Sequence, residues 1–330
     1  MNAAIRAVAR SAMQQGDEVV GIRRGYQGLA EGDFLQLEMP QVTGILHQGG
    51  TILSTSSFEP IREGMIDKVA AAFAEQRLDA VVAIGGEHTM EITRQLHTEH
   101  ELPLVGVPKT IDNDVGGTDF TFGFDTAVQI VTDAIDRLHT TAQSHDRIMV
   151  VEVMGRNTGW IAAYAGIAGG ADCIVIPEQT TTVEEICADV TRRHDRGKDF
   201  SIIVVAEGAK LAFASGEERL IQPIKESDEY GYPRLGGIGA AVATELERLT
   251  GYETRVTVLG HVQRGGTPTS TDRILATLYG AQAYEMAAAG EFGRMAAIHG
   301  TQMTSVPLEV AVEVKYVDLG MLEIAKRFFT

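Results

Sequence analysis

Five apolar runs along the chain each end in glycine or polar residues, and stretches with helical periodicity separate them. The runs cover residues 80–84, 103–107, 148–153, 201–206 and 255–259. Strands that are apolar throughout and alternate with helices are typical of parallel sheets covered by helices on both faces. At 330 residues the chain is long enough for two such domains. We therefore predict an α/β fold of two doubly wound, Rossmann-like domains with parallel sheets.

The charge balance restricts the partners of this chain. Its 28 basic and 45 acidic residues give a net charge of -17, which argues against nucleic acid and anionic membranes as partners. An anionic substrate must therefore be held by a local cluster of basic side chains. Cys173 and Cys187 are too few for a disulfide framework, and no apolar stretch reaches the length of a membrane span. We expect a cytoplasmic protein with reduced thiols.

Parallel sheets bind ligands beyond the carboxyl ends of their strands, where the five polar clusters lie. The most informative cluster is 108–114, in which Lys109 and Thr110 are followed by Asp112 and Asp114. One carboxylate of such a pair suits a metal ion and the other a proton, and a neighbouring lysine suits a phosphate. The alternative is a polar turn without chemistry, because Asp, Asn and Gly are common in turns for backbone reasons.

A second cluster joins an apolar run to a helix through two glycines. Gly85 and Gly86 offer backbone N–H groups at a helix N-terminus, an arrangement that suits a phosphate, although a bare Gly-Gly turn is weak support. Glu87 is a candidate magnesium ligand, His88 follows it, and Thr89 could cap the helix or touch a phosphate oxygen.

Three further strand ends carry candidate sugar-phosphate contacts. Met154, Gly155 and Arg156 form a glycine turn with a guanidinium, which can grip a carboxylate or phosphate with two hydrogen bonds, whereas Met154 could simply be packing. The remaining candidates are His261 and Arg264 within 260–266, Glu207 as an acceptor for sugar hydroxyls or as a helix cap, and Arg147 and Arg255 beside strands. For Arg147 a solvated charge or a salt bridge is the alternative.

Other chemistries lack their motifs in this sequence. It contains no Gly-x-x-x-x-Gly-Lys-Ser/Thr loop, no Gly-x-Ser-x-Gly elbow, no His-Glu-x-x-His pair and no Gly-x-Gly-x-x-Gly turn after a strand. The charged stretch 214–234 is expected to be a surface excursion.

The motifs together resemble those of the 6-phosphofructokinase family. The matching segments, in the family's order, are MNAAIR at 1–6, GGTIL at 49–53, PKTIDND at 108–114, VMGR at 153–156 and GHVQRGG at 260–266. The resemblance implies a glycolytic kinase that transfers a phosphoryl group, with Mg²⁺, to the 1-hydroxyl of fructose 6-phosphate. It also implies a donor domain of residues 1–123 and 263–312, a sugar-phosphate domain of residues 124–262 and 313–330, and an active site in the cleft between them.

The resemblance also implies roles for the candidate residues. Asp112 is the base that takes the proton from the sugar hydroxyl, Thr110 and Asp114 support the site and the metal, and Glu87 is associated with the metal. The sugar-phosphate contacts are Met154, Gly155, Arg156, Glu207, His261 and Arg264. Arg147 and Arg255 match residues that the family supplies from a neighbouring subunit, which implies a homodimer or homotetramer.

Three features depart from the family pattern. The family's opening strand and glycine turn, which holds donor phosphates, would precede Met1, so we expect either a longer reading frame or a reduced donor site. Ser57 occupies the position of a donor-binding arginine. The donor-selecting positions are mixed: Lys109 resembles pyrophosphate users but also occurs in some ATP users, and His88 is the usual residue of neither. His88 is bulky where a nucleotide α-phosphate would need room, and it can attract phosphate when protonated. These two positions slightly favour pyrophosphate over ATP as the donor.

Two alternative functions differ from this interpretation. A lipid or NAD kinase shares a related glycine turn, but it would not explain the motifs at 153–156 and 260–266. A sugar-phosphate-binding paralogue with impaired catalysis would follow if the donor site were incomplete.

Overall fold

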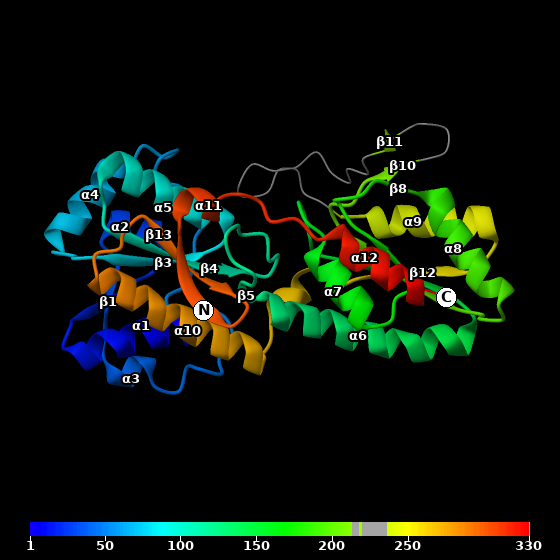
Figure 1. The fold of residues 1–330 in the computed structure, drawn as a ribbon, viewed down its shortest axis with the longest axis horizontal. Coiled ribbons are helices and arrows are strands. Elements are labelled where there is room, and N and C mark those ends of the chain that lie inside the picture. Colours follow the sequence, from blue (N-terminus) through cyan, green and yellow to red (C-terminus); the bar gives the residue numbers. More distant parts are fainter. Residues whose placement is uncertain (213–217, 220–235, 330) are drawn as a thin grey trace. The chain divides into compact units, whose positions relative to one another are not determined.

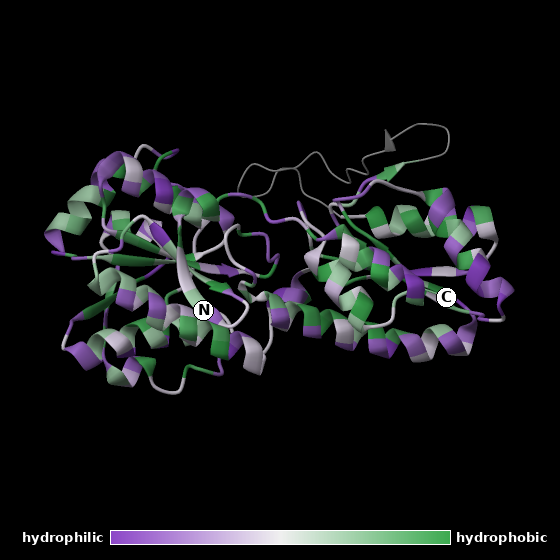
Figure 2. Ribbon diagram, in the orientation of Figure 1, coloured by the Kyte–Doolittle hydropathy of each residue, from purple (hydrophilic) through white to green (hydrophobic). Residues whose placement is uncertain are grey.

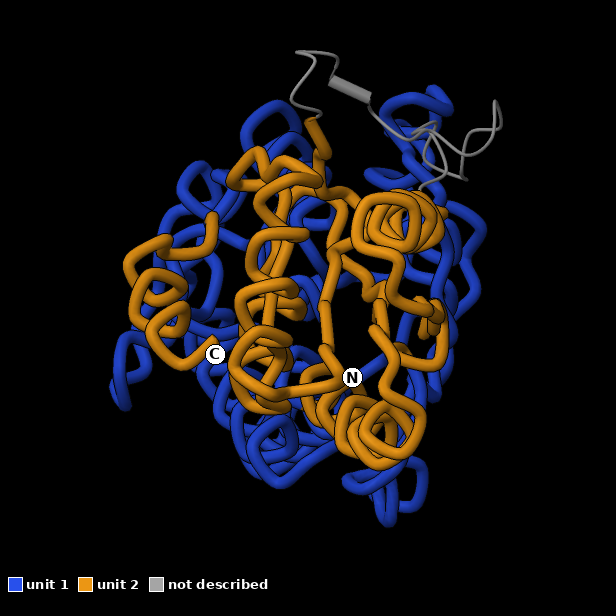
Figure 3. The backbone as a smooth tube through the Cα atoms, turned by 90° about the vertical axis from the view of Figure 1, so that its right-hand side faces the viewer, with its two compact units in different colours: residues 1–125, 265–315 blue, residues 126–264, 316–330 orange. Residues whose placement is uncertain are grey.

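The computed structural model describes residues 1–212, 218–219 and 236–329 (Figure 1). The chain forms two compact units, each built from segments that are distant in the sequence. Unit 1 comprises Met1–Asp125 and Gly265–Lys315, and unit 2 comprises Thr126–Arg264 and Tyr316–Thr330 (Figure 3). The chain passes between the units after residues 125, 264 and 315, where the sequence analysis expected passages after 123, 262 and 312.

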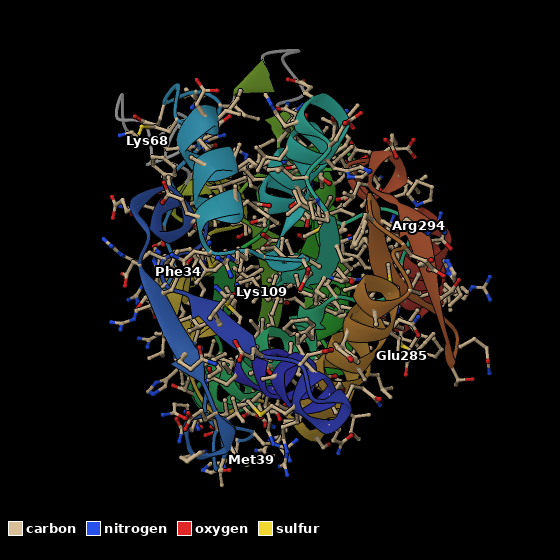
Figure 4. All side chains as sticks on the ribbon, turned by 90° about the vertical axis from the view of Figure 1, so that its left-hand side faces the viewer. Phe34, Met39, Lys68, Lys109, Glu285 and Arg294 are labelled. Atoms are coloured by element: carbon tan, nitrogen blue, oxygen red, sulfur yellow. The ribbon has the colours of Figure 1, made fainter. Side chains whose placement is uncertain are left out.

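Unit 1 is built on a five-stranded sheet with the order β14-β13-β4-β3 and β5 beside β4. Its strands are β3 (Val81–Gly85), β4 (Leu104–Thr110), β5 (Phe122–Gly123), β13 (Arg294–His299) and β14 (Gln302–Pro307). β3, β5 and β13 pair with β4 in parallel, and β14 returns antiparallel to β13. Arg294 strengthens that last pair, since its Nε lies 2.9 Å from Ser305 Oγ and its Nη2 lies 2.8 Å from the Ser305 carbonyl oxygen (Figure 4).

Helices cover both faces of this sheet, as the apolar character of β4 requires. α10 (Ser270–Ala288), with α1 (Asn2–Gln15) beside it, packs on one face, and α5 (Glu87–His100) with α11 (Leu308–Ala311) packs on the other (Figure 1). The remaining elements of unit 1 are α2 (Tyr26–Glu31), α3 (Met39–Val42), α4 (Ile66–Glu75) and the antiparallel pair β1 (Val19–Ile22) and β2 (Phe34–Leu37).

Unit 2 is built on a four-stranded, wholly parallel sheet with the order β12-β6-β9-β7. The strands are β6 (Ile148–Val153), β7 (Cys173–Val175), β9 (Ser201–Ala206) and β12 (Thr254–Val258). Every residue of β6 and β9 is buried, and Figure 2 shows these central strands as mainly hydrophobic. The predicted α/β fold with parallel sheets is therefore confirmed.

The helices of unit 2 again lie on both faces of its sheet. α8 (Val183–Asp195) packs on α9 (Ile238–Thr250), and α9 packs on β6 and β12, whereas α7 (Trp160–Ala168) packs on β7 and β9. The other elements are α6 (Phe124–His145), α12 (Leu319–Ala325), the 3-10 helices η1 (Gly260–Arg264) and η2 (Lys326–Phe328), and the short strands β8 (Thr181–Thr182), β10 (Leu211–Ala212) and β11 (Glu218–Arg219).

Two expectations of the sequence analysis concern the rest of the chain. Apart from β11, the expected surface excursion at 214–234 lies outside the described residues. Within the described ranges, none of the helices combines the length and the apolar character that crossing a membrane requires.

Candidate active site

The predicted catalytic loop begins inside a strand. The sequence analysis ended the apolar run at Val107, but β4 continues through Lys109 and Thr110, because these two residues pair with Phe122 and Gly123 of β5. The loop proper therefore begins at Ile111. Lys109 and Thr110 are half-buried and held by strand hydrogen bonding, so their backbone is fixed up to the residue before the turn.

In the turn after β4, the amide side chain of Asn113 is buried, whereas the carboxylates on either side of it are partly exposed. The backbone N–H of Asp112 donates to Thr110 Oγ1 at 3.1 Å, which gives the predicted support residue Thr110 a definite contact in the turn. Asn113 is fully buried and has a φ of 52°, a left-handed conformation that Asn tolerates better than most residues. Asp112 and Asp114, on either side of it, are both partly exposed.

The carboxylates at this sheet edge are close enough to influence one another. Burial, together with the negative charges of Asp112 and Glu87, raises the pKa of Asp114 to about 7. Burial also raises the pKa of Glu87. Glu87 begins α5 and Asp114 follows β4, so the structure unites the two predicted clusters of unit 1. Neighbouring carboxylates whose pKa values are raised in this way favour a bound cation.

The carboxylates of Asp112, Asp114 and Glu87 are of the ligand type expected for a Mg²⁺ ion that also binds phosphates. Oxygen ligands are those that Mg²⁺ prefers. Over the described ranges, no group of three or more His, Cys, Asp or Glu side chains is arranged to hold a metal ion by itself. Mg²⁺ commonly uses one or two carboxylates and completes its coordination with substrate phosphates and water. Glu87 and Asp114 are the residues that would hold it here.

The raised pKa of Asp114 leads to a prediction about stability. Its value of about 7 lies above the ordinary 3.8, so between about pH 4 and pH 7 the folded chain binds more protons than the unfolded chain, and stability falls as pH rises. Asp114→Asn removes this titration and keeps the shape of the side chain. As the pH rises from 4 to 8, we expect the free energy of unfolding of Asp114→Asn to increase relative to that of the wild type by about 1 to 4 kcal/mol.

Urea unfolding with a metal chelator present measures this difference at several pH values. Asp79→Asn, which removes an exposed carboxylate of unit 1, controls for the change in net charge. Parallel stability curves for Asp114→Asn and the wild type would contradict the prediction.

The glycine junction predicted as a phosphate site lies against the same turn. Gly85 of β3 is paired in register with Pro108 of β4, and Gly86 is the N-cap of α5. A Cβ on Gly85 would lie 2.1 Å from Thr89 Oγ1, so the Thr89 side chain folds over Gly85 and does not form the expected side-chain cap. The backbone N–H groups at the start of α5, with β4 as their neighbour, are therefore the part of this junction that could bind an anion.

His88 has an acidic neighbour from the loop that precedes α4. Its Nε2 lies 3.8 Å from Glu59 Oε2, a distance suited to an ion pair when the imidazole is protonated. Glu59 also lies 3.5 Å from Arg62 Nε. The loop 54–65 thus contributes both signs of charge beside the first turn of α5, which the sequence analysis did not anticipate.

In unit 2, the segments that follow the carboxyl ends of β6 and β9 are in close backbone contact. The backbone N–H of Glu207 donates to the Val153 carbonyl oxygen at 2.8 Å, and that of Gly208 donates to the Gly155 carbonyl oxygen at 3.0 Å. A Cβ on Gly208 would lie only 1.9 Å from the Arg156 carbonyl oxygen. This close approach brings the predicted contacts Arg156 and Glu207 to one place.

The segment after β12 joins the same group through a buried glutamine. Gln263 is 1% exposed, and its Oε1 accepts a hydrogen bond from the Met154 backbone N–H at 3.2 Å. Its Nε2 donates to the Gly260 carbonyl oxygen at 3.0 Å within η1. Gln263 thereby ties η1 to the end of β6, while His261 and Arg264 of η1 remain exposed. The sequence analysis predicted these two residues but missed the role of Gln263.

Arg147 and Arg255 lie at the other end of the same strands. Arg147 immediately precedes β6, whose six residues span about 20 Å, and Arg255 is the second residue of β12. Both guanidinium groups pair with Glu253; the distance from Arg147 Nη2 to Glu253 Oε1 is 2.9 Å. Within one chain, the structure therefore separates them from Arg156, and the salt bridge considered for Arg147 is present.

Comparison with known proteins identifies the family of this chain. The profile of the family described as Phosphofructokinase matches residues 1–287. A pyrophosphate–fructose 6-phosphate 1-phosphotransferase of Amycolatopsis mediterranei is 50% identical, over 100% of this chain and 96% of its own length. ATP-dependent 6-phosphofructokinase 3 of Streptomyces coelicolor is 48% identical, over 95% and 91%. The phosphofructokinase structure from Saccharomyces cerevisiae matches with a TM-score of 0.81 and 31% identity, over 99% of this chain and 44% of that one. The chain belongs to the phosphofructokinase family.

Proposed function

We propose that this protein transfers a phosphoryl group from pyrophosphate to the 1-hydroxyl of fructose 6-phosphate, a Mg²⁺-dependent reaction of glycolysis that gives fructose 1,6-bisphosphate. The observation that carries the proposal is the carboxylate group of Asp112, Asp114 and Glu87 beside the backbone donors of Gly85 and Gly86. A base, a cation site and a phosphate-binding helix end are the parts that phosphoryl transfer needs.

Unit 1 supplies the donor site and the base in this proposal. Asp112 accepts the proton of the sugar hydroxyl as the oxygen attacks phosphorus, and the hydrogen bond from its backbone N–H to Thr110 fixes the turn. Glu87 and Asp114 would hold Mg²⁺, which would neutralise charge on the phosphates. The first turn of α5 and Lys109 bind the donor phosphates.

Unit 2 supplies the sugar-phosphate site. Arg156 binds an anionic group of the sugar phosphate with two parallel hydrogen bonds, Glu207 accepts from sugar hydroxyls, and Met154 packs on the sugar. His261 and Arg264, held on η1 by the contact of Gln263 with β6, provide further contacts. Arg147 and Arg255 lie at the opposite strand ends, and we propose that they serve the site of a neighbouring subunit in a homodimer or homotetramer.

The choice of pyrophosphate over ATP rests on His88 and Lys109. The His88 side chain lies beside Glu59 at the start of α5, where a nucleotide α-phosphate would need room. Lys109 adds a positive charge that a small, highly charged donor uses well. The relatives include both pyrophosphate- and ATP-dependent enzymes, so the two donors must be compared directly.

Steady-state kinetics with each donor at equal concentration tests this choice. We expect a higher kcat/KM with pyrophosphate, and we expect Lys109→Met to lower it by about 10- to 100-fold, the effect of losing one hydrogen bond to a charged group. His88→Gly should raise kcat/KM for ATP. Lys68→Met, which removes an exposed lysine of α4, is the matched control and should leave both donors unaffected.

Two results would contradict parts of the proposal. A higher kcat/KM with ATP would overturn the donor preference and leave the phosphotransferase activity intact. Binding of fructose 6-phosphate in isothermal titration, without turnover of either donor, would support the sugar-phosphate-binding alternative and overturn phosphoryl transfer.

A further inference from the structure

A lysine at the end of unit 1 reaches the turn that carries the proposed base. Lys315 Nζ donates to Asn113 Oδ1 at 3.1 Å, to the Thr118 carbonyl oxygen at 2.9 Å and to the Asp119 carbonyl oxygen at 2.8 Å. An ammonium group has three protons, so these three oxygens match its donors in number. The side chain thus joins both arms of the loop 113–119 at one point.

The backbone around this lysine holds the same loop. The Lys315 N–H donates to the Asp114 carbonyl oxygen at 2.9 Å, and Val314 forms an antiparallel bridge with Val115. A Cβ on Gly116 would lie 2.3 Å from the Val310 carbonyl oxygen, so the two chain segments are in close contact. The segment 310–315 therefore lines the loop along its length, and Lys315 ends that segment.

Asn113 connects the lysine to the far end of the loop. Its Oδ1 accepts from Lys315 Nζ and also from the backbone N–H of Thr121 at 2.9 Å. Thr121 Oγ1 in turn donates to the Thr110 carbonyl oxygen at 2.9 Å, at the end of β4. Asn113 is fully buried and its backbone is in the left-handed conformation, so the contacts of its side chain determine how the residues on either side of it are placed.

A half-buried ammonium group is an energetically costly occupant of this position. Burial lowers the pKa of Lys315 to about 8, although the charges of Asp119 and Asp114 act in the opposite direction. An apolar side chain of similar length would avoid the desolvation cost, as comparisons of buried ion pairs with apolar replacements indicate. The main effect of the Lys315 cation is therefore to position the loop, and its contribution to the stability of the fold is smaller.

We propose that Lys315, acting through Asn113, is a positioning residue that fixes the Asp112–Asp114 turn in the geometry needed for phosphoryl transfer. The inference rests on the proposed function, because the turn matters for catalysis only if Asp112 is the base. A misplacement of about 1 Å in a catalytic group can lower a rate by about 10²-fold.

The test compares Lys315→Met, Lys315→Arg and wild type with saturating donor. We expect Lys315→Met to lower kcat by about 10- to 100-fold, with KM for fructose 6-phosphate within about twofold of wild type. Lys315→Arg, which keeps the positive charge and the hydrogen-bond donors of the side chain, should have a kcat between those of Lys315→Met and the wild type. Lys326→Met removes an exposed lysine of the same C-terminal region and should behave as wild type.

Asn113→Gly provides an independent check, since glycine keeps the left-handed backbone and removes Oδ1. If both residues act through one contact, the double variant should lose less kcat than the product of the two single losses. Multiplicative losses would overturn the role of Asn113 as the link. A kcat for Lys315→Met within twofold of wild type would overturn the role of Lys315.

Amide hydrogen exchange separates this inference from the proposed function, because it needs no activity. The Thr121 amide should exchange at least about 10-fold faster in Lys315→Met, while that of Val150 in unit 2 is unchanged. If Lys315→Met does not fold, the wild type alone provides the test. Its Thr121 amide should then be as protected from exchange as the Val107 amide in β4, and rapid exchange of the Thr121 amide would overturn the inference. An inactive wild type with a protected Thr121 would contradict the proposed function alone.

Discussion

Asp112→Asn is expected to lower kcat by about 10²- to 10⁴-fold, which corresponds to about 3 to 5 kcal/mol in the activation barrier. The amide has the shape of the carboxylate but cannot accept the proton of the attacking hydroxyl. The backbone N–H of residue 112 still donates to Thr110 Oγ1, so the turn itself should be kept. The loss should therefore appear in kcat, while the affinity for fructose 6-phosphate stays within about twofold.

Rapid-mixing kinetics with saturating donor and isothermal titration with fructose 6-phosphate measure these two quantities separately. Asp79→Asn, an exposed residue outside the site, is the control for the change in charge and should be fully active. A kcat for Asp112→Asn within about threefold of wild type would show that another group takes the proton. A parallel loss of sugar affinity would instead point to a distorted turn.

The sequence predicted the framework of the site because its signal is local. Apolar runs followed by glycine or polar residues indicated the strands, and the rule that ligands lie beyond the carboxyl ends of parallel strands placed the loops together. β3 and β4 are neighbours in register, and Glu87 and Asp114, which follow them, are near enough for the charge of Glu87 to raise the pKa of Asp114. The roles of these residues remain predictions that the kinetics above test.

The end of β4 was misjudged because its cause is not local. Lys109 and Thr110 are polar, so periodicity assigned them to the loop, but pairing with the two residues of β5 keeps them in the strand. A two-residue strand has no detectable alternation. The correction matters for the chemistry, since Lys109 is held on a strand and does not lie on a free loop.

The residues that hold the site were missed for a related reason. Lys315 lies 202 positions from Asn113, and Gln263 lies 109 positions from Met154. A lone lysine or glutamine in a sequence carries no signal for such a contact, because burial and hydrogen bonding depend on the tertiary fold. Glu253 was the exception, since it lies two residues from Arg255 and its charge could have suggested the pairing.

The second large effect is expected from Gly208→Ala at the end of β9. The added Cβ would lie 1.9 Å from the Arg156 carbonyl oxygen and 2.9 Å from that of Gly155, and backbone cannot yield as a flexible side chain does. The turn that carries Arg156 must therefore move away from Glu207. Because Arg156 is proposed to bind the sugar phosphate in ground state and transition state alike, KM for fructose 6-phosphate should rise by about 10²-fold with a smaller change in kcat.

Thermal unfolding distinguishes this local effect from a general loss of stability. Gly251→Ala is the matched control in the same unit: Gly251 has a φ of 74° and nothing within 4 Å of its Cβ position, so the variant should lose about 1 kcal/mol of stability and keep its KM. Gly208→Ala should lose about 1 to 3 kcal/mol by overpacking and also its sugar affinity. If both variants lost stability and neither lost affinity, the close contact between β6 and β9 would serve the fold and not the sugar-phosphate site. A rise in KM confined to Gly208→Ala would instead link that contact to Arg156.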